Sequence, residues 1–301
     1  MKRRIIQVCF ISLIALIGGG TILMLNSTVR TRGFFAFYRA WHAHWPFEAG
    51  KQLPDEMSRF FVPFVPIWVH VEPGVTMRLD PYDLVTRAIL LERTWEPSTT
   101  REMLQRVPAG GTFVDVGAHV GWYTLKLAKA VGPGGHVIAV EPNHETLVQL
   151  RDNISASGVG AFVVVAPVAC SDSEAMLTFY AASRANTGES SLSLANASQD
   201  KAIAASYAVR ARRLDDIVKE AHVGRVDAIK IDVEGAETLV LKGASETLDH
   251  DRPVVAVELI DRQLKAMGSS AAELTAFMTA HGYTAAGMHE DNMIFVPAVA
   301  R

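Results

Sequence analysis

Two acidic side chains, Asp115 and Glu141, lie 26 residues apart, each at the end of a short apolar run. A turn with two glycines, Gly117 and Gly121, follows the first of them. This turn lacks the third glycine of the G-x-G-x-x-G motif that seats a pyrophosphate, and its leading aspartate disfavours phosphate. Glu141 has the position from which an acidic residue binds both hydroxyls of a ribose. The pattern predicts a nucleoside site for a ligand that is cationic near the first turn.

A sulfonium nucleoside fits this description. S-adenosylmethionine carries a sulfonium and an ammonium group and needs no phosphate site, so we expect it as the cofactor. Asp115 and the two glycines are predicted to bind its methionine portion, and Glu141 its ribose. Ser171 and Asp172 follow the third predicted strand, where the adenine amino group is expected. For Asp172 the alternative is a polar residue of a turn.

Further acids follow the fourth and fifth predicted strands. Asp232, Glu234 and Glu237 stand within six residues, and Glu258 ends the fifth strand. They can act as a general base or contact the substrate, hold a divalent cation that lowers the pKa of an acceptor hydroxyl, or cap a helix. A structural hydrogen bond is the alternative for Glu258. We predict Asp232, Glu234 and Glu258 as catalytic residues and leave metal ligands unassigned.

For four further residues the sequence gives weaker evidence of a chemical role. His119, in the glycine turn, either acts as a base or lines the pocket, and an imidazole titrates in the range that suits a base. Lys230 either extends from a sheet edge or meets an acid. Trp122 and Tyr123 are interpreted as the core of a helix.

The elements that must position these side chains alternate between short apolar runs and amphipathic stretches, which is typical of a parallel sheet in an α/β fold. Such sheets bind ligands at the carboxyl ends of their strands. A loop or lid is expected over 183–200, and a capping box at Thr99 and Glu102 opens the domain. The predicted strands are 112–116, 136–140, 162–166, 226–231 and 254–257, with a terminal antiparallel hairpin over 283–296. The predicted helices cover 120–131, a segment capped by Asn143, one through Leu239 and Leu248, and one capped by Ser270.

Six segments of this region carry a family resemblance. They are VDVGAHVGWYTLKLAK from Val114, VIAVEPN from Val137, VACSD from Val168, RRLDDIV from Arg212, IKIDVEGAETLVLKGA from Ile229 and DNMIFVP from Asp291. Over about residues 97 to 297 the chain resembles the FkbM family of methyltransferases, and IDVEGAE is the most specific piece. The resemblance implies a Rossmann-like class I methyltransferase fold with a seven-stranded, mostly parallel sheet. It also implies S-adenosylmethionine as methyl donor and O-methylation of a hydroxyl, commonly on a sugar or another secondary metabolite. We expect the acceptor here to be a sugar, a glycolipid or another membrane-associated molecule.

Two other functions compete with this one. A methyltransferase-like protein that has lost catalysis and serves as a membrane interaction protein is disfavoured because Asp115, Glu141 and Asp232 are all present. A nicotinamide-dependent oxidoreductase is disfavoured by the missing third glycine. The acceptor, whether a small molecule, a lipid or a glycan, and the oligomeric state have no signature in the sequence.

Charge and cysteine content exclude other classes. The 29 basic and 32 acidic residues of this 301-residue chain give no positive field of the kind that binds nucleic acid. Cys9 and Cys170 are too few for a disulfide framework or a structural zinc site.

The N-terminus predicts contact with a membrane. Val8 to Leu25 runs eighteen residues without a charge, about one bilayer crossing, and basic residues flank it. Residues 1–26 are interpreted as an uncleaved hydrophobic helix that anchors the chain, with a cleaved signal peptide or a buried core helix as alternatives. We expect a single-pass membrane protein whose catalytic domain faces the cytoplasm, where the methyl donor is made.

The next segment, 27–96, is rich in aromatic residues and precedes a methyltransferase domain predicted over 97–301. Eleven of the 24 aromatic residues fall in 33–70. They suit the headgroup layer, which would extend membrane contact over residues 1–70, or a hydrophobic flap packed on the following domain.

Overall fold

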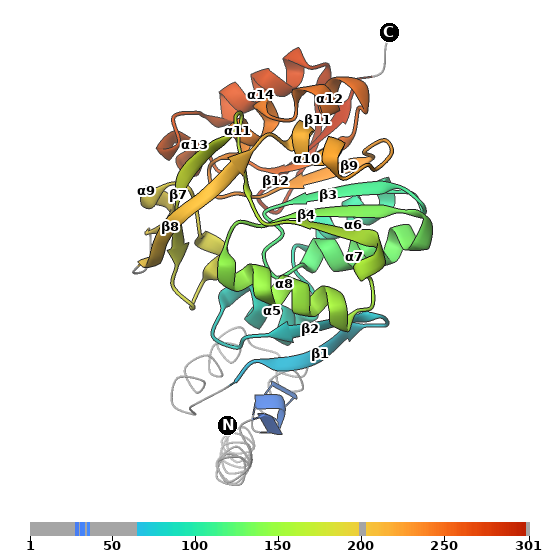
Figure 1. Cartoon of the computed structure of the whole chain (residues 1–301), viewed down its shortest axis with the longest axis vertical. Coiled ribbons are helices and arrows are strands. Elements are labelled where there is room, and N and C mark those ends of the chain that lie inside the picture. The colour runs from blue at the N-terminus through green and yellow to red at the C-terminus, as the bar shows by residue number, and fades with distance from the viewer. Residues whose placement is uncertain (1–27, 30, 34, 37–64, 199–202, 299–301) are drawn as a thin grey trace, which may run out of the picture.

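A seven-stranded β-sheet forms the centre of the computed structural model, which describes residues 28–29, 31–33, 35–36, 65–198 and 203–298 (Figure 1). The strands lie in the order β11-β12-β10-β9-β3-β4-β5. Their bounds are β3 (Thr112–Val116), β4 (His136–Val140), β5 (Val163–Ala166), β9 (Ala228–Ile231), β10 (Val254–Glu258), β11 (Tyr283–His289) and β12 (Asn292–Pro297). Both antiparallel pairings involve β12, and the others are parallel. The predicted mostly parallel sheet with a terminal antiparallel hairpin is confirmed.

Each face of this sheet has its own hydrophobic core. Phe113 and Val114 are fully buried neighbours in β3 that point into different cores, because successive side chains of a strand face opposite ways. Burial on both faces explains why these strands are continuous apolar runs in the sequence. One face is covered by α6 (Pro97–Arg106), α7 (Trp122–Val131) and α8 (His144–Ala156). The other is covered by α10 (Leu214–Glu220), α11 (Glu237–Lys242), α12 (Ser245–His250), α13 (Asp261–Ala266) and α14 (Ala271–Ala280) (Figure 1).

Side-chain caps begin two helices as predicted. Asn143 accepts a hydrogen bond from the backbone N–H of Glu145 at 3.0 Å, and Ser270 accepts one from Glu273 at 3.2 Å. The capping box predicted at Thr99 is wrong, because α6 already begins at Pro97, whose fixed φ suits the first helical position. The Thr99 hydroxyl instead donates to the Glu290 carboxylate at 2.7 Å.

The single helix predicted through Leu239 and Leu248 is two helices, α11 and α12, which meet at Gly243. A Cβ atom at Gly243 would lie 2.1 Å from the carbonyl oxygen of Ser171. The helix therefore breaks at Gly243, where the absence of a side chain allows the backbone to pack against Ser171.

Residues 65–96 pack against the helix α8. They form a hairpin of β1 (Ile67–Glu72) and β2 (Val75–Leu79), followed by α5 (Leu84–Glu92). Val75, Met77 and Leu79 have no exposed surface and share a core with the helices of this face. The backbone N–H of Arg78 donates to Asn153 Oδ1 of α8 at 2.7 Å. Of the eleven aromatic residues of 33–70, the structure describes Phe35, which is buried, and Trp68, which is 43% exposed. The choice between a headgroup layer and a hydrophobic flap stays a prediction, as does the domain boundary at residue 97.

The predicted membrane localisation is corrected. Within the described residues no helix has the length and apolar character needed to cross a bilayer, and the longest, α8, has 13 residues where about 20 are required. The prediction of a single-pass membrane protein with its catalytic domain facing the cytoplasm is wrong on this finding, and the described residues give no support to membrane contact through residues 1–70. The hydrophobic helix predicted within residues 1–26 lies outside the described residues.

A second sheet of three strands follows β5, in the order β6-β8-β7. Its strands are β6 (Ala169–Cys170), β7 (Ala175–Ala182) and β8 (Ile203–Arg212). Short helices η3 (Thr187–Glu189) and α9 (Leu194–Ala197) lie between β7 and β8 in the segment predicted as a loop or lid, and two more, η1 (Gly132–Gly134) and η2 (Gly160–Phe162), lie elsewhere in the chain. The sequence pattern missed β7 and β8 because both are rich in alanine and half exposed, so their alternation is weak.

Because Met77 is fully buried, Met77→Ala should lower the free energy of unfolding by about 2–5 kcal/mol. Urea unfolding of the whole chain measures this. Met176→Ala is the control, since Met176 is 66% exposed, and should change stability little. Equal stability of both variants would show that the hairpin is not part of the core.

Candidate active site

A cavity of about 310 Å³ opens at the carboxyl ends of four adjacent strands, β3, β4, β9 and β10. Asp115 of β3, Glu141 after β4, Asp232 after β9 and Glu258 of β10 all line it. The segment 186–192 contributes to the opposite wall, and residues of α5 and the α6 start complete it. With Gly117 and Glu234, six of the nine predicted site residues thus line one cavity.

The glycine turn after β3 is shaped by close approaches. Gly117 has φ +85°, and a Cβ atom there would lie 1.8 Å from the carbonyl oxygen of Asp232. The backbone N–H groups of Gly117 and Ala118 both donate to Val140 O, at 2.9 and 3.0 Å. The turn is therefore tied to the ends of both neighbouring strands. Gly121, also with positive φ, lies outside the cavity lining and leaves room for Leu150 of α8.

Asp115 is a buried carboxylate at the inner end of the cavity. The Thr124 hydroxyl donates to its Oδ2 at 2.6 Å. Burial raises the pKa of Asp115 to about 6, against the opposing effects of Thr124 and the Lys230 charge. A positively charged ligand beside it would restore the ionised form.

Glu141 is buried and already accepts three hydrogen bonds. His119 N–H donates to Oε2 at 2.7 Å, while Asn143 N–H and the Thr146 hydroxyl donate to Oε1 at 2.8 and 3.0 Å. Burial raises the pKa of Glu141 despite these donors. A carboxylate has about four acceptor positions, so the one that remains for a ligand is on Oε2.

Ser171 and Asp172 lie away from the cavity. Ser171 is buried against α11 through its backbone, and Asp172 is exposed and accepts a hydrogen bond from Ser173. The residues immediately before them, Ala169 and Cys170, line the cavity instead. An adenine contact by Ser171 or Asp172 stays a prediction.

The acids after β9 and β10 form a cluster. One carboxylate oxygen each of Asp232, Glu234 and Glu258 lies within 4.8 Å of the other two. Lys230, 1% exposed, donates to Asp232 Oδ2 at 3.0 Å. Of its two interpretations, the structure supports the one in which Lys230 meets an acid. Burial alone would lower the pKa of this lysine, but the carboxylates of Asp232, Glu96 and Glu258 raise it.

Two acids of the cluster are held in unusual environments. Burial first, and then the neighbouring carboxylates, raise the pKa values of Glu234 and Glu258 well above the ordinary range. Gln263 Nε2 donates to Glu234 Oε2. Within the described part of the chain, Gln263 Oε1 and Glu258 Oε2 are buried and have no hydrogen-bond partner. This wall of the cavity therefore offers acceptors that need donors or a cation.

Glu237 has a different role from its neighbours. It is buried outside the cavity lining, and its Oε1 accepts hydrogen bonds from the N–H groups of Val233 and Gly235 at 3.1 and 3.0 Å. Of the three interpretations given to the acids, helix and turn capping fits Glu237.

Several site residues were not predicted from the sequence. Glu96 accepts hydrogen bonds from the Tyr123 hydroxyl at 2.5 Å and from Asn292 Nδ2 at 3.0 Å, and it lines the cavity. The Lys230 ammonium lies 5.4 Å from the centroid of the Tyr123 ring. Tyr123, interpreted as helix core, is buried but brings its hydroxyl to the cavity. Tyr123, Lys230 and Asn292 lie in segments that the resemblance singled out, whereas Glu96 precedes all of them.

Comparisons with known proteins agree with this architecture. Residues 115–285 match the family model of the methyltransferase FkbM domain. The AMB antimetabolite synthetase AmbE of Pseudomonas aeruginosa is 26% identical in an alignment of 210 positions that covers 59% of this chain and 10% of that protein, so the chain spans about a tenth of this relative.

Two solved structures are similar at low identity. A methyltransferase FkbM from Methylobacillus flagellatus KT has 14% identity and a TM-score of 0.43, over 87% of this chain and 76% of that one. A putative O-methyltransferase from Klebsiella pneumoniae has 12% identity and a TM-score of 0.45, over 88% of this chain and 100% of that one.

Proposed function

Because this chain belongs to the FkbM family of S-adenosylmethionine-dependent methyltransferases, we propose that it methylates a hydroxyl oxygen of a small polyhydroxylated acceptor such as a sugar. The observation that carries the proposal is the set of carboxylates at the ends of four adjacent strands. Asp115 and Glu141 line the cavity at the ends of β3 and β4, and Asp232 and Glu258 line it at the ends of β9 and β10. The first pair suits the cofactor and the second the acceptor.

The residues assigned to the cofactor fit a cationic nucleoside. Bound S-adenosylmethionine supplies a methyl group on a positively charged sulfur. Asp115 offers the opposite charge beside the turn, and Glu141 Oε2 offers one acceptor position to a ribose hydroxyl. Ala169 and Cys170 give an apolar surface for the adenine ring. We assign the methionine portion to Asp115 and Gly117 and the ribose to Glu141.

The residues assigned to the acceptor fit a molecule with many hydroxyl groups. Glu258 Oε2 and Gln263 Oε1 lack donors within the described residues, and the hydroxyls of a sugar supply donors. Asp232 would serve as the base: its carboxylate would accept the hydroxyl proton of the acceptor when bound S-adenosylmethionine supplies the methyl group. Lys230 holds Asp232 in position through their 3.0 Å contact. Glu234 and Glu258 orient the acceptor.

A divalent cation is a second candidate for the same cluster. Two ligands of one ion cannot lie farther apart than twice the metal–oxygen distance, about 4.6–5.2 Å for Ca²⁺ and about 4.0–4.2 Å for Mg²⁺. The 4.8 Å limit on the three carboxylate oxygens falls within the range for Ca²⁺. Asp232, Glu234 and Glu258 would hold the ion with Gln263 Oε1 as a neutral ligand, and the ion would lower the pKa of the acceptor hydroxyl.

Removing the ribose-binding carboxylate tests the cofactor assignment. Glu141→Ala should weaken S-adenosylmethionine binding by about 1–3 kcal/mol, because His119 N–H and the ribose hydroxyl both lose an acceptor. Titration calorimetry measures the change. Glu145→Ala removes an exposed acid four residues on and should leave the affinity unchanged. Equal affinity in the two variants would remove Glu141 from the nucleoside site.

Cofactor affinity should also depend on pH. Since the pKa of Asp115 is about 6, its carboxylate is mostly protonated below that pH and loses its attraction for a cation. Affinity for S-adenosylmethionine should fall about tenfold from pH 7.5 to pH 5. Asp115→Asn should bind weakly at both values with a flatter profile. An unchanged profile in this variant would assign the titration to another group.

Asp232→Asn should lower turnover by about 100-fold or more, the usual contribution of a general base, and leave cofactor affinity unchanged. Turnover is the transfer of label from S-adenosyl-[methyl-³H]methionine to a small-molecule extract of the source cells. Analysis of the labelled product by mass spectrometry and NMR shows whether the new methyl group is on oxygen. Asp249→Asn, at an exposed acid on α12, is the control.

The same assay distinguishes a mechanism in which Asp232 is the base from one in which a bound cation lowers the pKa of the acceptor hydroxyl. Turnover that survives EDTA in the wild type, together with loss in Asp232→Asn, supports the base alone. Loss with EDTA and recovery with Ca²⁺ or Mg²⁺, with calorimetric binding of the ion that Glu258→Gln abolishes, supports the cation. Normal turnover in Asp232→Asn would remove this residue from the chemistry.

A further inference from the structure

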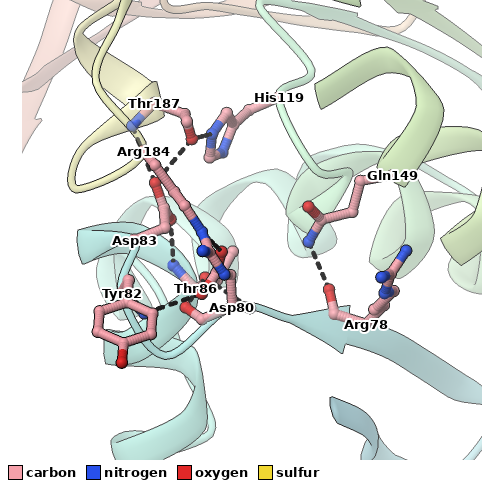
Figure 2. Close-up of polar contacts among 9 residues, drawn as sticks. All are labelled: Arg78, Asp80, Tyr82, Asp83, Thr86, His119, Gln149, Arg184 and Thr187. Atoms are coloured by element: carbon pink, nitrogen blue, oxygen red, sulfur yellow. Dashed lines mark hydrogen bonds and ion pairs between the residues drawn. The ribbon is translucent and has the colours of Figure 1, made fainter. Parts of the chain in front are cut away.

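A chain of hydrogen bonds runs from the N-terminal part of the protein to the glycine turn (Figure 2). Asp83, which begins α5, accepts hydrogen bonds at Oδ2 from the Thr187 N–H at 2.9 Å and from the Thr187 hydroxyl at 2.6 Å. Thr187 Oγ1 in turn lies 2.7 Å from His119 Nε2. Asp83 precedes the region matched to the family, which begins at residue 115. Three segments distant in the sequence therefore meet at one imidazole ring.

The chemistry of the three groups sets the direction of these bonds. Asp83 is 3% exposed, and its two oxygens accept hydrogen bonds from the backbone N–H groups of Thr86 and Thr187, both at 2.9 Å, which stabilise its ionised form. An ionised carboxylate only accepts, so the single hydroxyl proton of Thr187 points to Asp83. The Thr187 oxygen must then accept from His119 Nε2–H. This arrangement fixes the proton of His119 on Nε2.

The other ring nitrogen, Nδ1, has no hydrogen bond within the described part of the chain, and His119 lines the cavity. The backbone of the same residue donates to Glu141 Oε2, the oxygen assigned to the ribose. In the neutral ring whose proton is on Nε2, Nδ1 is an acceptor. A hydroxyl group that donates to Glu141 Oε2 could therefore lie close to His119 Nδ1 as well.

The segment that carries Thr187 is fastened to the N-terminal part at further points. The backbone N–H of Leu84 donates to Ala185 O at 3.0 Å. Arg184 pairs with Asp80 at 2.6 Å and lies over the Tyr82 ring (Figure 2), although Arg184 is 58% exposed and such pairs contribute little. The buried contact between Asp83 and Thr187 is the one that defines the position of the imidazole.

We propose that Asp83 and Thr187 are positioning residues that hold His119 with its proton on Nε2, so that Nδ1 accepts a hydrogen bond from a ribose hydroxyl of S-adenosylmethionine. Glu141 and His119 then bind the ribose together. The inference rests on the proposed function, because it needs that nucleoside in the cavity. It assigns to the region before residue 97 a part in cofactor binding.

Three variants separate positioning from folding. Thr187→Val removes the hydroxyl and keeps the shape, and Thr187→Ser restores the hydroxyl. Asp83→Asn can still cap α5 through its amide oxygen, because asparagine is an equally good N-cap, but its NH₂ group then faces the two Thr187 donors and can accept neither. Thr178→Val, at an exposed threonine of β7, is the matched control.

Calorimetry should show about a tenfold rise in the Kd for S-adenosylmethionine in Thr187→Val and Asp83→Asn, and a change below about twofold in Thr187→Ser and Thr178→Val. Turnover at saturating cofactor, by the label-transfer assay, should stay near the wild-type value. ¹⁵N NMR should report the Nε2-protonated ring of His119 in the wild type and a mixture of tautomers in Thr187→Val. The signal is assigned by its absence in His119→Gln.

The outcomes distinguish this inference from the proposed function. A wild type that does not bind S-adenosylmethionine would overturn the proposed function itself. Wild-type binding with an unchanged Kd and tautomer in Thr187→Val would overturn only the role of Thr187 and Asp83. A fall in turnover at saturating cofactor with an unchanged Kd would place His119 on the acceptor side and also overturn the inference.

Discussion

The close contact between Gly117 and the main chain after β9 is the constraint on which the site depends. A single added carbon at this position would lie 1.8 Å from the Asp232 carbonyl oxygen, so the turn after β3 and the acids after β9 can share one cavity only because no side chain separates them. The two bonds from this turn to Val140 O bring the end of β4 to the same place. Cofactor and acceptor residues meet because three strand ends meet.

Electrostatics is the second feature of the cavity. Three clustered carboxylates share it with one buried ammonium, that of Lys230, and with Asp115 and Glu141. Raised pKa values at Asp115, Glu141, Glu234 and Glu258 show that burial disfavours this much negative charge. Ligands that bring positive charge or hydrogen-bond donors relieve it. The unfavourable burial of these carboxylates in the folded protein is relieved when such a ligand binds, and this relief contributes to the binding free energy.

The sequence predicts the parts of this protein that are determined locally. Buried parallel strands such as β3 and β4 are continuous apolar runs between turns. Asp115 and Glu141 stand at the ends of these runs, so they can be identified from the sequence without knowledge of the fold. Glu96, Tyr123 and Thr187 could not be found in this way, because each reaches the site through a partner 27 to 104 residues away. The break at Gly243 and the start of α6 depend likewise on contacts with distant residues. Long-range hydrogen bonds have no local periodicity.

The hairpin β1–β2 and α5 show why the sequence-based boundary near residue 97 matters in practice. Their apolar side chains complete the core beneath α8, and Leu84 and Val85 at the start of α5 line the cavity. A chain shortened to residue 97 would present bare hydrophobic surface to water and would be prone to aggregate. Recombination between related chains would have to transfer residues 65–96 together with the sheet, as one inseparable unit.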